Sequence, residues 1–339
     1  MFSKLLFRKA ANLLAITKHP FAGWTARIHS TIRGQKLYTA LAQYRRHLLV
    51  ILVVLLLSTS LAHASEPICN TAETIFCEDW EGTAPLPGQW ADGFNASLQT
   101  ITTTAGNVYQ GSRALETFWS AGSAGAGWLS RWFKTNGQPT IPVTGYDHVY
   151  ARLYFKLHSN FTCAPNCPKV MVLSGNRTDN PWSASGQAGI CPNGTDYFYA
   201  GVATSQVGPR NFILYDYYPD MRCTQPVGQN YGEYIYFSPV AQAPLATWTC
   251  LETEVLLNTP GAHNGLHRAW LNGVLAVEKL NMRWRDSTIL NLNSFQLSFS
   301  GNPGADTRMW IDNVVVSTQR IGCLSETTSP AAPVGLTVR

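Results

Sequence analysis

The chain has 339 residues, with 25 Lys and Arg against 20 Asp and Glu. Nine of the basic residues and none of the acidic ones lie in residues 1–64, so the remainder carries a net charge of about −4. The basic balance of the whole chain therefore gives no support for nucleic-acid binding, and we expect no nucleic-acid partner. After residue 64 the chain is rich in Gly, Pro and aromatic residues and shows no helical periodicity, which favours an all-β fold.

The first 64 residues predict a secretory signal segment. Arg45 and Arg46 precede an apolar run over 48–57, and residues 62–64 (Ala-His-Ala) have the small side chains of a cleavage site. The run is too short for a membrane-spanning helix, which needs about 20 residues. We expect ordinary secretion rather than twin-arginine export, because the residues around the arginine pair fit the latter poorly. The prediction is a secreted or periplasmic protein with no membrane span after signal cleavage.

All eight cysteines follow this segment, and an even number in an exported chain predicts disulfides. Cys163 and Cys167 have the spacing of half a zinc site, but no second Cys or His pair completes it. The sequence does not fix the connectivity. The pairing that we expect is Cys69–Cys77, Cys163–Cys167, Cys191–Cys223 and Cys250–Cys323.

Residues 65–323 are predicted to form one domain. Short stretches of β-forming residues recur with turn residues between them, a pattern typical of a β-sandwich. The tail over 324–339 is rich in Ser, Thr, Pro and Ala, so we expect it to be disordered or to be a truncated linker. The expected strands before the central meander are 74–80, 98–104, 113–119, 128–134, 149–157, 169–173, 197–203, 212–218 and 234–237; those after it are 295–299 and 309–317.

The strand over 148–158 has two distinct faces. Val149, Leu153 and Phe155 point to one side, as core residues of a sandwich do. The opposite side is a ladder of aromatic and cationic groups, a composition that suits a groove for acidic sugars. A solvated sheet face is the alternative, because polar ladders are common on antiparallel sheets. This second face holds His148, Tyr150, Arg152, Tyr154, Lys156 and His158.

Two tyrosines share a face in the strand over 212–218. Tyr215 and Tyr217 lie two residues apart, so strand alternation directs both side chains to the same side. Such a pair can supply two hydroxyl groups to a site. Tyrosine is also common in strands, so a pair of aromatic residues packed under a loop is the alternative interpretation.

Residues 247–277 predict an antiparallel meander. Runs of alternating character over 248–257 and 266–271 flank a segment, 258–265, that is rich in turn-forming Pro, Gly and Asn. Asn272 and Gly273 suit a type I′ turn, after which residues 274–277 can return as a third strand.

The meander also resembles a known family. A tryptophan, an acidic strand, the Asn-Thr-Pro-Gly turn over 258–261 and a strand ending in Trp-Leu-Asn-Gly over 270–273 are similar to the jelly-roll polysaccharide lyases that cleave alginate and glucuronan. The likeness continues through residues 283–285 (Arg-Trp-Arg) to the closing strand over 310–316, and extends to the wider concanavalin-A-like lectin and glucanase group. It implies an all-β, two-sheet antiparallel jelly-roll sandwich.

The resemblance also implies a site. The Tyr-x-Tyr strand is similar to the one that holds the catalytic tyrosines of alginate-type lyases, and Lys169 stands where the family places a groove lysine. The lyases carry a Ser-x-Arg strand just before this one, whereas residues 197–204 contain no arginine. Arg152, Arg177 and His267 are candidates to replace it. This departure bears on activity more than on fold.

A lyase hypothesis follows from these residues. A uronate lyase removes the proton next to the carboxylate and expels the 4-linked oxygen, which requires a base and an acid. Tyrosine can serve where cations lower its pKa, and positive charge on the carboxylate stabilises the enolate-like state. We therefore expect β-elimination on a uronic-acid polysaccharide, with catalytic residues Tyr215, Tyr217 and Lys169 and substrate-binding residues Arg152, Tyr150, Tyr154, Lys156 and His267.

Other functions stay open at this point. A non-catalytic carbohydrate-binding module of the same fold would use the groove aromatics to stack on sugar rings. A hydrolase would use Glu252 and Glu254, two carboxylates on one strand face, although the third acid of that motif is missing. Asp312 and Asn313 offer oxygen ligands for a structural calcium ion, or else cap the last strand. We expect a monomer that binds a polysaccharide and needs no cofactor.

Overall fold

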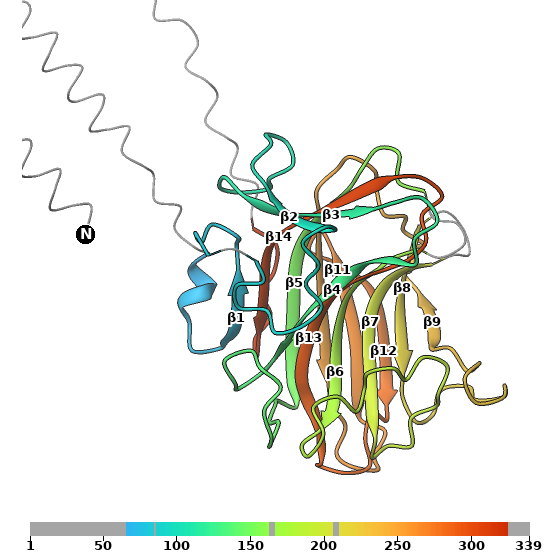
Figure 1. The fold of residues 1–339 in the computed structure, drawn as a ribbon. Coiled ribbons are helices and arrows are strands. Elements are labelled where there is room, and N and C mark those ends of the chain that lie inside the picture. The colour runs from blue at the N-terminus through green and yellow to red at the C-terminus, as the bar shows by residue number, and fades with distance from the viewer. Residues whose placement is uncertain (1–65, 85, 163–166, 206–209, 325–339) are drawn as a thin grey trace, which may run out of the picture. The chain divides into compact units, whose positions relative to one another are not determined.

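The computed structural model describes residues 66–84, 86–162, 167–205 and 210–324. These residues form two antiparallel sheets and one 3-10 turn, and Figure 1 shows the sheets packed face to face. The elements are η1 (Pro67–Asn70), β1 (Thr74–Glu78), β2 (Gln99–Thr102), β3 (Ala114–Trp119), β4 (Gly125–Trp132), β5 (His148–Leu157), β6 (Lys169–Arg177), β7 (Tyr197–Ser205), β8 (Asn211–Tyr217), β9 (Glu233–Tyr236), β10 (Thr249–Leu256), β11 (Gly265–Leu271), β12 (Val274–Met282), β13 (Leu290–Ser300) and β14 (Thr307–Ser317).

The first sheet has the order β12-β11-β10-β5-β14-β3-β2, and β1 pairs with β14. The second sheet has the order β4-β13-β6-β7-β8-β9. Neighbours such as β5 and β14 are far apart in sequence, as expected for a jelly roll rather than a simple meander. The prediction of a two-sheet antiparallel jelly-roll sandwich is confirmed.

The core lies between the two sheets. Val149, Leu153 and Phe155 of β5 are at most 1% exposed, and Leu173 of β6 and Leu214 of β8 face them with 0% exposure. The alternation predicted for β5 therefore places the expected residues inside. Burial of such side chains contributes about 1.5–3 kcal/mol each.

The predicted meander is present as β10, β11 and β12. Leu251 pairs with Leu271 and Leu256 with Leu266 across the first hairpin. Asn272 and Gly273 both have positive φ, 50° and 82°, which a type I′ turn requires. The second hairpin follows directly from this turn.

Three expected disulfides are confirmed: Cys69–Cys77, Cys191–Cys223 and Cys250–Cys323. The fourth expected pair includes Cys163, which lies outside the described residues, as do the predicted signal segment and all but the first residue of the predicted tail. Among the residues that are described, no helix is long and apolar enough to span a membrane.

Candidate functional site

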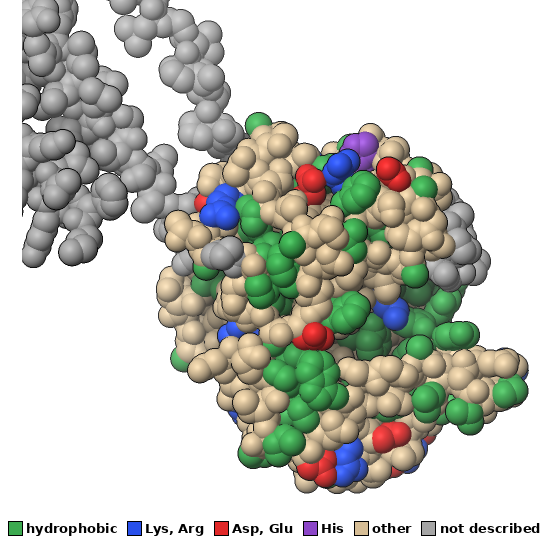
Figure 2. Space-filling model, viewed as in Figure 1, with side chains coloured by type: hydrophobic (Ala, Val, Ile, Leu, Met, Phe, Trp, Pro, Cys, Tyr) green, Lys and Arg blue, Asp and Glu red, His purple; other side chains and the backbone are tan. Residues whose placement is uncertain are grey.

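The outer face of the second sheet carries a cleft of about 350 Å³. Strands β4, β13, β6, β7 and β8 contribute to it, and the loop over 184–188 forms part of its wall. In Figure 2 hydrophobic side chains gather around a hollowed surface on the molecule. The lining is mainly aromatic and neutral polar, and it includes Asp92, Trp128, Lys169, Tyr199, Tyr217 and Ser298.

Strand β8 directs its tyrosines to this face. Tyr217 lines the cleft, and its hydroxyl lies 2.9 Å from that of Tyr215. The backbone N–H of Gly189 donates to the Tyr217 hydroxyl at 3.3 Å. The two side chains are only 4% and 7% exposed, so the loop at Gly189 covers part of them. The alternation of the strand turns the residue between them, Asp216, into the core.

Lys169 stands beside the tyrosine pair. Its Nζ lies 5.0 Å from the centroid of the Tyr215 ring and 5.2 Å from that of Tyr199, both within cation–π range. Burial lowers the pKa of Lys169 to about 8, because desolvation disfavours its charged form. The structure thus brings together the three residues that the sequence analysis proposed as catalytic.

Tyr199 of β7 is a cleft residue that the sequence analysis did not select. Its ring lies 5.9 Å from that of Tyr217 and 6.1 Å from that of Tyr215. Two positions further along β7, a Cβ on Gly201 would lie 2.9 Å from the Tyr199 ring, so the close packing here requires glycine. The Tyr-x-Tyr spacing of 197–199 is the sequence signal that could have identified it.

Burial keeps part of this tyrosine cluster protonated. Desolvation raises the pKa of Tyr215 and of Tyr199 above the ordinary value for tyrosine, and the nearby Tyr217 adds to both shifts. Their hydroxyls are therefore hydrogen-bond donors at neutral pH. Such donors are suited to a leaving oxygen or to the hydroxyl groups of a sugar.

Directly behind the tyrosine pair, Asp216 and His267 link the two sheets. The Nδ1 atom of His267 on β11 lies 2.9 Å from Asp216 Oδ1, and its Nε2 atom lies 2.8 Å from the hydroxyl of Thr253. Asp216 and His267 are both 0% exposed. Burial raises the pKa of Asp216, and the neighbouring His267 opposes that shift. His267 is therefore a core residue and does not reach the cleft, contrary to the role expected for it.

The structure does not bring Arg152 into this cleft, so the prediction that it shares one groove with Lys169 is wrong. Arg152 lies on the outer face of the first sheet, is 0% exposed, and forms an ion pair with Glu66. Its Nη1 also donates to the carbonyl of Asn313 at 2.7 Å. These partners engage both Nη groups of Arg152, so the buried side chain is held in a structural contact and is not open to a substrate.

The rest of the predicted ladder on β5 is similarly engaged. The Tyr150 hydroxyl donates to Glu254 at 2.7 Å, and Tyr154 stacks on Tyr109 with ring centroids 3.7 Å apart. Lys156 donates to Asn107 at 2.8 Å and lines a separate hollow with Trp310. None of these three residues is among those that line the cleft of the second sheet. The sequence could not reveal this, because the partners lie far away in the chain.

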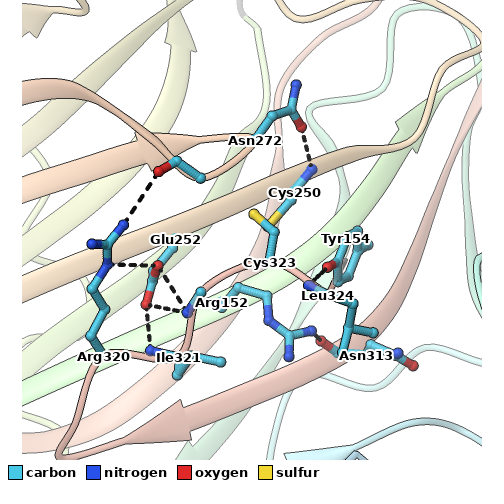
Figure 3. The surroundings of a disulfide bond; sticks show 12 residues. Arg152, Tyr154, Cys250, Glu252, Asn272, Asn313, Arg320, Ile321, Cys323 and Leu324 are labelled. Atoms are coloured by element: carbon cyan, nitrogen blue, oxygen red, sulfur yellow. Dashed lines mark hydrogen bonds and ion pairs between the residues drawn. A yellow bond between two sulfur atoms is a disulfide. The ribbon is translucent and has the colours of Figure 1, made fainter. Parts of the chain in front are cut away.

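The C-terminal segment over 320–324 covers part of the same face. Figure 3 shows the Cys250–Cys323 bond beside Arg152, Tyr154 and Glu252. The backbone N–H of Ile321 donates to Glu252 at 2.7 Å, and that of Leu324 donates to the Tyr154 hydroxyl.

The two carboxylates considered for a hydrolase are also engaged on this sheet. Glu252 is 0% exposed and lies 3.6 Å from Arg320 in addition to its backbone partners. Glu254 contacts His148 at 2.7 Å and Arg268 at 3.3 Å. Because both carboxylates are held in ion pairs away from the cleft, the arrangement does not favour the hydrolase alternative.

Asp312 holds a neighbouring loop. Its carboxylate accepts from the backbone N–H groups of Tyr109 at 2.9 Å and Gln110 at 3.2 Å. Burial raises its pKa to about 7, although these hydrogen bonds oppose the shift. Within the described residues no group of three or more His, Cys, Asp and Glu side chains is placed to hold a metal ion.

Comparison with known proteins bears on the fold. No protein-family model matches the chain, and no curated protein matches it. Among solved structures, the alginate lyase Aly36B is similar with a TM-score of 0.51 and 17% identity, over 73% of this chain and 98% of that one. The marine PL-14 alginate lyase from Aplysia kurodai is similar with a TM-score of 0.52 and 15% identity, over 73% of this chain and 100% of that one.

At these identities the likeness establishes the fold alone. The described domain has the jelly-roll sandwich of these alginate lyases, as the sequence resemblance implied. What the chain does has to be argued from its own residues.

Proposed function

We propose that this chain binds a uronic-acid-containing polysaccharide in the cleft of the second sheet and cleaves it by β-elimination. The observation that carries the proposal is the hydroxyl pair of Tyr215 and Tyr217 beside the ammonium group of Lys169. A proton-transfer pair next to a partly buried cation is what the chemistry requires. The fold that the chain shares with alginate lyases is consistent with this function.

Each residue has a role in the proposed reaction. The Lys169 ammonium group pairs with the substrate carboxylate and stabilises the negative charge that develops on it. Tyr217 acts as the base and takes the proton from the carbon next to the carboxylate. A double bond forms from that carbon to its ring neighbour as the bond to the 4-linked oxygen breaks. The Tyr215 and Tyr217 hydroxyls then deliver a proton to the leaving oxygen, so the proton taken is returned.

A non-catalytic carbohydrate-binding protein is the second candidate. The 4% and 7% exposure of Tyr217 and Tyr215 favours it, because a base must reach the reacting carbon. Ultraviolet absorbance distinguishes the two functions on a panel of alginate, glucuronan and heparin-type polymers, because elimination creates a conjugated double bond. Increasing absorbance supports the lyase. Calorimetric binding without any change in absorbance supports the binding protein.

We also propose that residues 1–64 are a secretory signal and that 65–323 is the exported domain. The three disulfides support an extracellular location, since such bonds persist in oxidising compartments. N-terminal sequencing of the protein from the culture medium or periplasm tests this proposal. A start near Ser65 is expected, and full-length protein retained in the cytoplasm would contradict it.

A further inference from the structure

Trp128 of β4 presents an indole face to the cleft. The side chain is 44% exposed, while its Nε1 donates to Asp92 Oδ2 at 2.9 Å. Asp92 is itself fixed to β4, because the N–H of Ser130 donates to the Asp92 carbonyl at 3.0 Å. The tryptophan is therefore held at its polar edge, and 44% of its surface stays exposed. An aromatic ring held in this way can stack on a sugar ring with little loss of entropy on binding.

Gly93 packs against the same pyrrole edge of the indole. Its φ is 87°, and a Cβ at this position would lie 2.1 Å from Trp128 Cδ1. Any other residue would push the indole away, so the close approach requires glycine. Asp92, Gly93 and Trp128 thus form a preorganised unit rather than a tryptophan that happens to be exposed.

This unit stands near the proposed catalytic cluster. Trp128 is opposite Ser298 of β13, and the next residue of β13, Leu297, is opposite Met171 of β6. Lys169 lies two residues before Met171, at the same end of the sheet as Trp128. The two residues are therefore separated by two strand spacings, about 10 Å. A sugar next to the one held by Lys169 can span such a distance.

The charge beside Trp128 selects the kind of sugar. Among the described residues that line the cleft, Lys169 and Asp92 are the charged ones, and they have opposite signs. A uronate stacked on Trp128 would place its carboxylate close to the Asp92 carboxylate, and the two would repel. A neutral sugar would instead donate hydroxyl hydrogen bonds to the free lone pairs of Asp92.

We propose that Trp128 and Asp92 form a subsite for a neutral sugar next to the uronate held by Lys169. The substrate class is then a polysaccharide in which 4-linked uronate residues are separated by neutral sugars, rather than a polymer of uronate alone. The assignment of the uronate to Lys169 rests on the proposed function.

Two polymers test this subsite. Deacylated gellan carries 4-linked glucuronate between neutral sugars, whereas glucuronan is glucuronate throughout. Affinity is measured by isothermal titration calorimetry and elimination by ultraviolet absorbance, each on the wild-type protein and on Trp128→Ala and Asp92→Asn. The matched control is Leu280→Ala, which alters an exposed hydrophobic side chain of the first sheet. Thermal unfolding shows whether each variant is folded.

The wild-type protein should bind gellan more tightly than glucuronan. Trp128→Ala should weaken gellan binding roughly twofold to tenfold, the range for an aromatic contact. Asp92→Asn keeps the shape and removes the charge, so it should strengthen glucuronan binding roughly fivefold. Leu280→Ala should change neither affinity. If Trp128→Ala does not fold, Asp92→Asn still provides the test.

Three results would overturn the subsite: tighter binding of glucuronan than of gellan by the wild-type protein, no binding of either polymer, or an unchanged affinity ratio in Asp92→Asn. These results are distinguishable from a failure of the proposed function. Gellan binding that depends on Trp128 without any elimination would retain the subsite and refute the lyase. Elimination of glucuronan that neither Trp128→Ala nor Asp92→Asn changes would refute the subsite and retain the lyase.

Discussion

The hydroxyl oxygens of Tyr215 and Tyr217 lie 2.9 Å apart on the cleft face of β8. Alternation alone places the two side chains on one face, but their separation reflects the packing of Lys169 and the loop at Gly189 around them. In the proposed reaction this hydrogen-bonded pair transfers the proton as one unit.

The charge of Lys169 should limit activity at high pH. Burial lowers its pKa to about 8, so the ammonium group is present below that pH and is lost above it. If it binds the substrate carboxylate, kcat/KM should fall as the pH rises above about 8, since this parameter reports groups of the free enzyme. A pH profile of elimination measures this directly.

Substitution of the same lysine provides a second prediction. Lys169→Met should lower kcat/KM roughly tenfold to a hundredfold at neutral pH, the effect of losing a hydrogen bond to a charged group. The remaining activity should lack the decline above pH 8. Lys134→Met is the control, because Lys134 also packs on a tyrosine ring, Tyr146, but does not line the cleft. Equal losses in the two variants would show that the lysine has no specific role.

The buried pair behind the tyrosines should be important for stability. Asp216→Ala leaves His267 without its Nδ1 partner in a site with 0% exposure, so the free energy of unfolding should fall by about 3–5 kcal/mol. The double variant Asp216→Leu/His267→Leu should recover much of this loss, because an apolar pair leaves neither polar group buried without its partner. Urea denaturation of the variants measures both effects.

The control for this pair is an exposed ion pair. Asp179→Ala removes the partner of Arg177 at the surface, where solvent screens such pairs and they add little to the free energy of unfolding. If Asp216→Ala were no more destabilising than Asp179→Ala, the Asp216–His267 contact would not stabilise the two sheets.

The Cys250–Cys323 disulfide should affect stability and not activity. Its loop spans 73 residues, for which the chain-entropy model gives roughly 4 kcal/mol. The variant Cys250→Ala/Cys323→Ala should lose up to this amount in guanidinium denaturation. Its kcat/KM should be unchanged, because the bond lies on the first sheet and the cleft on the second. A large loss of activity in a folded variant would contradict this separation.

The sequence predicted the features that depend on local pattern. Alternation in β5 placed Leu153 in the core, and the Asn272-Gly273 pair predicted the turn between β11 and β12. Alternation likewise predicted that the side chains of Tyr215 and Tyr217 lie on the same face of β8. In each case the residues involved are neighbours in the chain or recur with the period of a strand.

The sequence could not predict which sheet face is open. The aromatic and cationic face of β5 predicted a groove for acidic sugars. Instead, Arg152 is paired with Glu66, 86 residues away, and Tyr154 is stacked on Tyr109. Trp128 and Asp92 of the cleft were missed for the same reason, because their contact depends on how distant segments pack. Packing between segments that are distant in the sequence therefore determines which sheet face carries the open cleft.

The proposed role of Tyr217 is to transfer a proton during elimination. The most direct measurement is ultraviolet absorbance with Tyr217→Phe on the polymer that the wild-type protein cleaves best, with binding measured on the same sample. Tyr231→Phe, on an exposed tyrosine, is the control. Tyr217→Phe keeps the ring and lacks the hydroxyl, so we expect elimination to be abolished while the dissociation constant changes little. Elimination at the wild-type rate by a folded Tyr217→Phe variant would show that Tyr217 does not transfer the proton.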